Sequence, residues 1–204
     1  MVSTMRRLLT LIVALLATTS ILSAQLFDAN FSDSTLRLDY TFMGNASEQY
    51  IALRDITETD GWWGRRVNLG SVPLKGNGDL TLSDSETGEV IYKTSFSSLF
   101  QEWITTPEAS SITRSFEFTI LVPKPQRETL ATLVLRENAG KESVHTFELN
   151  PTDVLIGDRS RHEPLPHTYV HRGGDPKECI DVVILAEGYT ADEAELFYAD
   201  AQKA

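Results

Sequence analysis

The chain has 204 residues, 41% of them hydrophobic, and a formal net charge of −11. This composition is typical of a soluble globular protein and argues against intrinsic disorder, and so acidic a chain is a poor partner for nucleic acid. Its single cysteine, Cys179, rules out an internal disulfide, and we expect this residue to be a small, half-buried packing group.

Residues 1–24 are typical of a secretory signal peptide. Arg6 and Arg7 precede a largely apolar stretch over residues 8–22, and Ser23-Ala24 supply the small residues of a cleavage site. The apolar stretch is short for a membrane span, so the sequence favours cleavage over an uncleaved anchor. We therefore expect an exported protein (periplasmic, cell-surface or extracellular) that keeps no stable membrane span after the signal is removed.

Residues 25–150 show the alternation of apolar and polar side chains that is typical of half-buried strands. Six or more short strands with turn residues between them predict an antiparallel β-sandwich, so the expected fold class is mainly β. The expected strands are Leu36–Phe42, Tyr50–Asp55, a hairpin of Leu80–Leu82 with Val90–Tyr92, Phe116–Val122, and a hairpin of Thr129–Arg136 with Ser143–Leu149 around Asn138-Ala139-Gly140.

Two adjacent tryptophans, Trp62 and Trp63, lie between two glycines. Neighbouring residues of a strand point to opposite faces, so we expect one indole in the core and one on the surface. Two interpretations remain open. Either both indoles are structural, packed in the core or against Arg65 by a cation–π contact, or an exposed tryptophan stacks on a sugar.

A helical period interrupts the strand pattern at Phe96, Leu99, Phe100 and Trp103. We expect a short helical connection there, lying over one end of the sandwich. The stretch from Ser95 to Ser110 supplies too few polar groups to favour a cofactor pocket.

Residues 151–176 contain four of the eight prolines and follow neither period, which predicts a linker. Its histidines, His162, His167 and His171, resemble a zinc motif only loosely. A zincin requires two histidines four apart on a helix with a glutamate between them. Prolines interrupt the first pair and no glutamate lies within the second, so we expect a solvated linker, with adventitious zinc binding as the alternative.

The remaining polar groups show no pattern of a catalytic site. Carboxylate pairs such as Glu86 with Glu89, and Asp192 with Glu193, are expected to be solvated charges of turns and of a helix start. No phosphate-binding loop and no nucleophile elbow is present in the sequence.

Residues 177–204 predict one β-α unit. The apolar, β-branched run Ile180–Ala186 is typical of a strand buried on both faces, and Thr190 with Glu193 predicts a capping box for a helix from Ala191 to at least Lys203. One strand and one helix cannot bury their own apolar faces. We therefore expect the start of a truncated second domain, loosely held after residue 150 and prone to aggregate.

Four stretches carry a family resemblance: "TLRLDYTFMGN", "SFSSLFQEWITTPEA", "FEFTILVPKP" and "DVVILAEGYTADEAELFYADA". In this order they resemble the bacterial IgA-peptidase family of secreted zinc metallopeptidases, from about Phe31 to the last residue. The resemblance implies an N-terminal β-sandwich of no known catalytic role, followed by an α/β zincin-type peptidase whose first strand and helix are Ile180–Ala204.

The resemblance also implies the chemistry of the intact protein, which is hydrolysis of a protein or peptide by a zinc-activated water, with two histidine ligands and a glutamate base. The family's H-E-x-x-H helix lies downstream of this first β-α unit, so no catalytic, zinc-binding or cofactor-binding residue is expected in this chain, which should be inactive alone. Glu187, Gly188 and Tyr189 resemble the loop after the family's first strand and are expected to be structural or cleft-rim residues. The alternative is an exported binding module that holds a glycan or a cell-surface protein through Trp62 and Trp63.

Overall fold

The computed structural model describes residues 26–72, 74–136, 142–159, 166–175, 179–180 and 182–203. Two compact units are distinguished, residues 1–160 and residues 161–204, and each is described by itself. The expected signal peptide, the expected turn at residues 138–140 and His162 lie outside the described residues.

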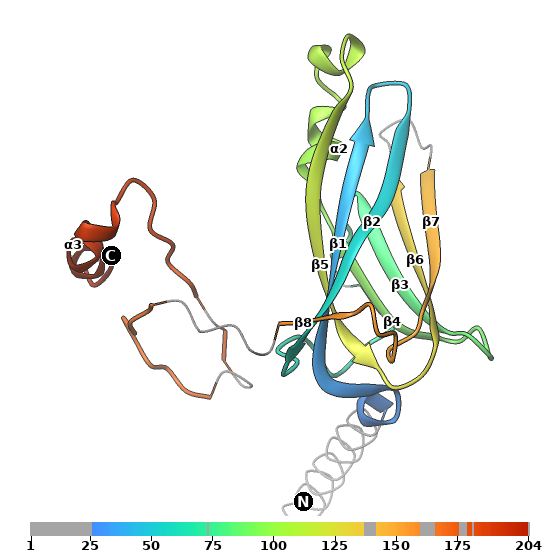
Figure 1. The fold of residues 1–204 in the computed structure, drawn as a ribbon, viewed down its shortest axis with the longest axis horizontal. Coiled ribbons are helices and arrows are strands. Elements are labelled where there is room, and N and C mark those ends of the chain that lie inside the picture. The colour runs from blue at the N-terminus through green and yellow to red at the C-terminus, as the bar shows by residue number, and fades with distance from the viewer. Residues whose placement is uncertain are drawn as a thin grey trace, which may run out of the picture. The chain divides into compact units, whose positions relative to one another are not determined.

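The first unit is a sandwich of two four-stranded sheets (Figure 1). Sheet A has the strand order β5-β1-β2-β8, and sheet B has the order β4-β3-β6-β7. All pairings are antiparallel except that of β2 with β8, which confirms the predicted fold class. The strands are β1 (Phe31–Gly44), β2 (Gln49–Asp60), β3 (Gly78–Asp84), β4 (Val90–Phe96), β5 (Arg114–Pro125), β6 (Thr129–Arg136), β7 (Glu142–Leu149) and β8 (Gly157–Asp158).

The core lies between the two sheets and consists of the apolar half of each alternating strand. Each fully buried leucine or phenylalanine stabilises the fold by about 1.5–3 kcal/mol relative to an exposed one, so this repeated pattern accounts for most of the cohesion between the sheets. In β1 the predicted inward positions are all fully buried, and they meet leucines of β3 and β6 across the core. These residues are Leu36, Leu38, Tyr40 and Phe42 in β1, and Leu80, Leu82, Leu133 and Leu135 in the facing sheet.

The predicted helical connection is present as α2 (Leu99–Trp103), followed by the 3-10 turn η1 (Pro107–Ser110). Ser98 caps α2, because its hydroxyl accepts a hydrogen bond from the Gln101 backbone N–H at 3.2 Å. The helix lies at one end of the sandwich (Figure 1). Phe96, expected within this helical pattern, instead ends β4, where it pairs with Gly78 of β3.

A short strand lies within the stretch expected to be a linker. β8 pairs with Thr57 and Glu58 of β2, and the Arg159 backbone N–H donates to the Glu58 carbonyl at 2.8 Å. Ile156, just before β8, packs against the core. Two paired residues are too few to produce a periodic pattern, so the sequence offers no sign of this strand.

The second unit contains no strand over its described residues, and the predicted strand Ile180–Ala186 is wrong there. Ile180 and residues 182–186 are irregular, and the Ile180 side chain is 92% exposed. A strand buried on both faces requires neighbouring strands for its backbone hydrogen bonds, and the described part of this unit supplies none. Cys179 is exposed rather than half-buried because it precedes a strand that is not formed.

The predicted helix is present but shorter than expected: a 3-10 turn η2 (Ala191–Glu193) continues into α3 (Ala194–Ala201), which ends before Lys203. Its predicted capping box is confirmed, with the Glu193 carboxylate accepting hydrogen bonds from the Thr190 backbone N–H and hydroxyl, each at 2.9 Å. Tyr189 packs edge-on against Phe197 with ring centroids 5.4 Å apart. Within the described ranges, no helix is long and apolar enough to cross a membrane.

Candidate functional site

The tryptophan loop, residues 61–66, is held by polar contacts to the start of β1. The Gly61 backbone N–H donates to the Asp33 carbonyl at 3.0 Å, and the Thr35 hydroxyl donates to the Gly61 carbonyl at 2.6 Å. The Asp33 carboxylate accepts from the Trp62 backbone N–H at 3.1 Å and pairs with Arg66. These contacts hold the loop backbone against the start of β1.

One indole is buried and the other exposed, as predicted, although residues 61–66 form a loop and not the strand on which the prediction was based. Trp62 is 6% exposed, its indole N–H donates to the Arg65 carbonyl at 3.1 Å, and its ring meets Tyr92 edge-on at 6.0 Å. Gly64 permits this packing, because a Cβ there would lie 2.2 Å from the Trp62 ring. Trp63 is 64% exposed and its indole lies against Gly61, whose φ of +79° favours glycine.

Arg65 is not stacked on a tryptophan. Its guanidinium lies 5.3 Å from the Tyr92 ring centroid and donates to the carbonyls of Leu69, Ser71 and Lys93. The five N–H groups of a guanidinium suit a position among several backbone carbonyls that need partners. The expected cation–π contact therefore exists, but its aromatic partner is a tyrosine of β4.

A hollow of about 350 Å³ lies beside the segment that follows the tryptophan loop. Its walls combine exposed and buried apolar side chains with amide, hydroxyl and carboxylate groups. Asn68 in its wall has a φ of +52°, a left-handed conformation that asparagine tolerates better than most residues. The hollow is lined by Leu26, Asn30, Asn68, Leu69, Gly70, Ser71, Glu89, Val90 and Ile91.

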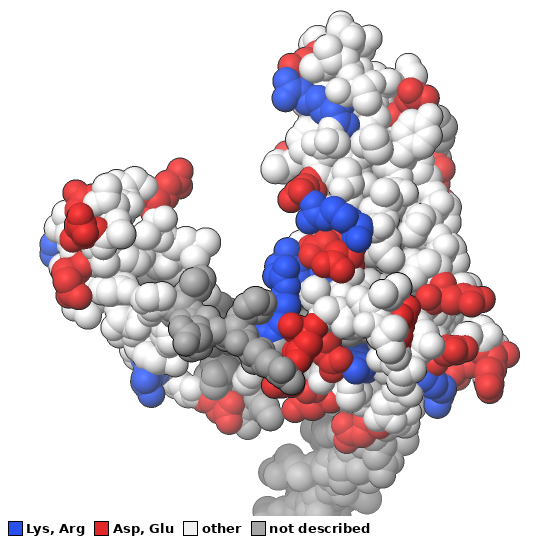
Figure 2. Space-filling model, in the orientation of Figure 1, with Lys and Arg blue, Asp and Glu red and all other residues white. Residues whose placement is uncertain are grey.

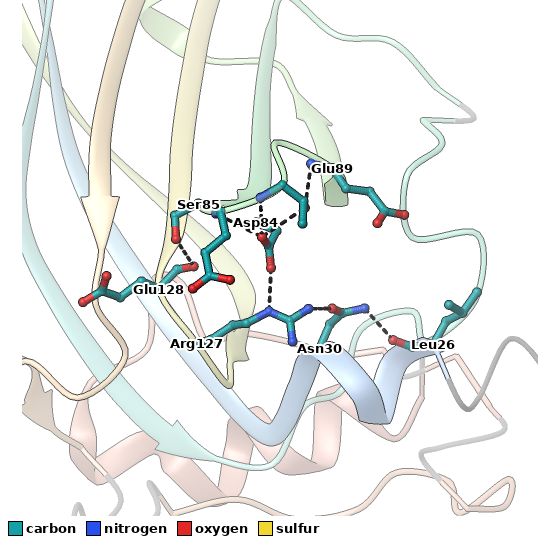
Figure 3. Close-up of polar contacts among 9 residues, drawn as sticks. Leu26, Asn30, Asp84, Ser85, Glu89, Arg127 and Glu128 are labelled. Carbon is teal, nitrogen blue, oxygen red and sulfur yellow. Dashed lines mark hydrogen bonds and ion pairs between the residues drawn. The ribbon is translucent and has the colours of Figure 1, made fainter.

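One wall of this hollow is held by a polar network around Asp84, at the end of β3 (Figure 3). The Asp84 carboxylate accepts from the Thr87 backbone N–H at 2.8 Å and from Arg127 Nε at 2.5 Å. Arg127 Nη2 also donates to the Asn30 side-chain carbonyl at 2.9 Å, and Asn30 Nδ2 donates to the Leu26 carbonyl at 2.9 Å. The network thus joins the β3–β4 turn, the β5–β6 turn and the helical turn of residues 26–30.

The same contacts determine the protonation of Asp84. The backbone N–H of Thr87, and then the Arg127 guanidinium, lower the pKa of Asp84 to about 2. A carboxylate with so low a pKa stays ionised at neutral pH and is a poor general acid or base. Glu89 follows the same turn, but Figure 3 shows its carboxylate pointing away from Asp84. Asp84 and Glu89 therefore do not form an opposed pair of carboxylates.

A second hollow, the aromatic hollow, has a volume of about 200 Å³ and lies between the start of α2 and β5. Four phenylalanines from β1, α2 and β5 converge there, and two glutamates lie at its rim. Sequence reasoning missed it because these residues are far apart in the chain. It is lined by Phe42, Ser97, Ser98, Leu99, Phe100, Glu102, Phe116, Glu117 and Phe118.

His167 and His171 lie in an irregular segment of the second unit. His167 packs edge-on against Tyr169 with ring centroids 5.7 Å apart, and the Arg172 guanidinium lies over the Tyr169 ring, 3.8 Å from its centroid. Among the residues that the structure describes, no three His, Cys, Asp or Glu side chains are grouped so as to hold a metal ion.

Comparison with known proteins identifies the sandwich. The family model described as Peptidase M64 N-terminus matches residues 26–147, a range that runs from the helical turn before β1 almost to the end of β7. A search of the curated proteins finds no match. The chain therefore belongs to the family of peptidase M64 N-terminal domains.

Proposed function

We propose that this chain is the N-terminal region of an exported zinc metallopeptidase of the bacterial IgA-peptidase family, and that its sandwich has no catalytic role. The observation that carries the proposal is the family match over residues 26–147, which coincides with the sandwich. The resemblance of the C-terminal stretch to the start of a peptidase domain supports the same assignment. Zinc and its ligands belong to the intact peptidase, so no reaction step is assigned to residues of this chain.

The electrostatics of the sandwich agree with a structural role for its buried carboxylates. Burial raises the pKa of Asp39, but hydrogen bonds from Thr119 and Arg37 outweigh this effect and hold the pKa below its usual value. The pKa of Asp79 is lowered in the same way by Arg136, against the effect of burial. These carboxylates are ionised ion-pair partners on the sheets rather than acids or bases facing a cleft.

Protease assays on two forms of the protein test the proposal. The chain alone and a longer form encoded by the continuing gene are incubated with unfolded casein, with and without a zinc chelator. We expect cleavage by the longer form only, lost on chelation and restored by zinc, and an H-E-x-x-H motif in the added sequence. Chelator-sensitive cleavage by the chain alone, or a longer form with no such motif, would contradict it.

Export is tested separately by the N-terminus of the mature protein. The signal peptide expected over residues 1–24 places the first mature residue at or near Gln25. Sequencing of protein from the culture medium or the periplasm should therefore begin there. Membrane-bound protein that begins at Met1 would instead favour an anchor.

A second candidate function, an exported module that binds a glycan or a cell-surface protein, is favoured by Trp63. This indole is 64% exposed and held on Gly61, and a pre-positioned aromatic face is suited to stacking on a sugar. Screening the whole chain on a glycan array, with Trp63→Ala as the variant and Tyr50→Ala as an exposed aromatic control, tests it. Binding lost only in Trp63→Ala supports this function; no binding, or equal loss in both variants, contradicts it.

A further inference from the structure

The edge of sheet A at β5 is open. β5 pairs with β1 on one side, and within the described ranges no backbone hydrogen bond joins its other side to another segment. An exposed strand edge of this kind accepts an added strand from another chain unless charges, prolines or a covering segment prevent it. Pro123 and Pro125 lie at one end of β5, and neither a proline nor a bulge interrupts its pairing with β1 from Glu117 to Val122.

The other end of β5 is contacted by the helical connection. Trp103 of α2 packs on Phe116 with ring centroids 5.5 Å apart, and Glu108 of η1 pairs with Arg114 at 2.7 Å. The edge that remains for a partner strand is therefore residues 117–122. It begins directly beside the aromatic hollow, whose lining includes Phe116, Glu117 and Phe118.

The aromatic hollow has the size for one side chain. Its volume of about 200 Å³ is below the ~300–1,000 Å³ that is usual for small-molecule and cofactor sites. Phe42 and Phe100 are fully buried behind it, and the Phe42 ring stacks on Phe118 with centroids 5.3 Å apart. Leu99 at the rim is 70% exposed, so the apolar surface continues out to solvent.

The charges at the rim select the kind of side chain. Glu102 of α2 and Glu117 of β5 both line the hollow, but Glu117 is already paired with Arg54, so the Glu102 carboxylate is the one left for a partner. Phenylalanine faces attract cations, and the long stem of a lysine or arginine packs on apolar surface while its charged end reaches a carboxylate. Figure 2 shows Lys and Arg lying among Asp and Glu on one face, but the net charge of −11 still adds a longer-range attraction for a basic partner.

We propose that the edge of β5 over residues 117–122, together with the aromatic hollow, binds an extended segment of another protein that carries a lysine or arginine. The segment adds a strand to sheet A, and its basic side chain enters the hollow towards Glu102. This site is separate from the tryptophan loop, and the inference stands whether or not the proposed peptidase function holds.

Fluorescence anisotropy with a labelled hexapeptide of alternating threonine and lysine tests the proposal on the whole chain. Two matched peptides serve as controls: one has glutamate in place of lysine, and the other has proline in place of threonine, which removes backbone donors. The protein variants are Glu102→Lys at the rim and Glu86→Lys in the exposed β3–β4 turn. Thermal unfolding of both variants verifies that they are folded.

We expect the threonine–lysine peptide to bind, with affinity reduced by about tenfold or more for both control peptides and for Glu102→Lys, and unchanged for Glu86→Lys. Bound peptide should also slow hydrogen exchange in residues 117–122. No binding at millimolar peptide, equal binding of the proline peptide, or equal loss in the two variants would overturn the proposal. The last of these results would mean that the acidic surface as a whole attracts the peptide.

Discussion

Arg127 Nε lies 2.5 Å from Asp84 Oδ2, and through this ion pair two turns and the helical turn of residues 26–30 are tied together (Figure 3). The two residues are 43 positions apart, so the contact joins the β3–β4 turn to the β5–β6 turn. Because the Asp84 carboxylate also accepts from the backbone of its own turn, one side chain stabilises both the local turn and its packing on the neighbouring one.

Replacing Asp84 should therefore change the dependence of stability on pH. The pKa of Asp84 is about 2 in the fold against an ordinary 3.8, so the ionised carboxylate stabilises the fold above about pH 4, and this contribution is lost as the pH falls towards 2. We expect Asp84→Asn to melt at a lower temperature than wild type at pH 7, with the difference disappearing between pH 4 and 2. Circular dichroism melts across that range measure it, with Asp28→Asn at a nearby exposed position as control. A difference that stays constant down to pH 2 would contradict the prediction.

The two tryptophans should respond very differently to truncation. Trp62→Ala empties a buried site against Tyr92, and we expect a loss of about 3–5 kcal/mol in the free energy of unfolding. Trp63→Ala removes an exposed ring, and we expect a change within about 0.5 kcal/mol. Urea unfolding of the two variants provides the comparison. Similar losses in both would show that Trp63 is also a packing residue.

Part of this arrangement follows from the sequence alone. The alternation in Leu36–Phe42 predicts the core face of β1, and Thr190 with Glu193 predicts the capping box, because both signals are local. The aromatic hollow and the Arg127–Asp84 pair are not local, since each depends on how distant strands are placed side by side. The run Ile180–Ala186 shows the opposite case, in which a strong local preference for strand is not realised without a neighbouring strand.

Tyr40 offers a test of a buried polar group. It is fully buried in β1, burial raises its pKa well above the usual value, and its hydroxyl has no hydrogen-bond partner among the described residues. An unpaired buried hydroxyl costs about 1–3 kcal/mol, so Tyr40→Phe should raise the free energy of unfolding by about 1 kcal/mol. Tyr92 is the matched control, because burial raises its pKa but Arg65 and Thr94 interact with its hydroxyl and lower that pKa, and Tyr92→Phe should be destabilising. Urea unfolding shows whether each variant is more or less stable than wild type. A less stable Tyr40→Phe variant would mean that the Tyr40 hydroxyl has a hydrogen-bond partner.

Truncation from the C-terminus should locate the end of the stable sandwich after β8. Ile156 packs on the core, and the backbone of residues 157–159 pairs with β2, so cutting the chain after Asn150 removes both contributions. We expect this cut to lower the free energy of unfolding by about 1–3 kcal/mol, whereas a cut after Arg159 should leave the melting temperature nearly unchanged.

Hydrogen exchange on the whole chain supplies an independent measurement of the same boundary. Residues 182–186 form no strand and expose most of their apolar side chains, so their amides should exchange much faster than those of β1 and β5. If the cut after Arg159 lowers the melting temperature as much as the cut after Asn150, and residues 182–186 are protected, then the residues beyond β8 also contribute to stability. Loss of stability only with the shorter form places the boundary between β8 and the second unit.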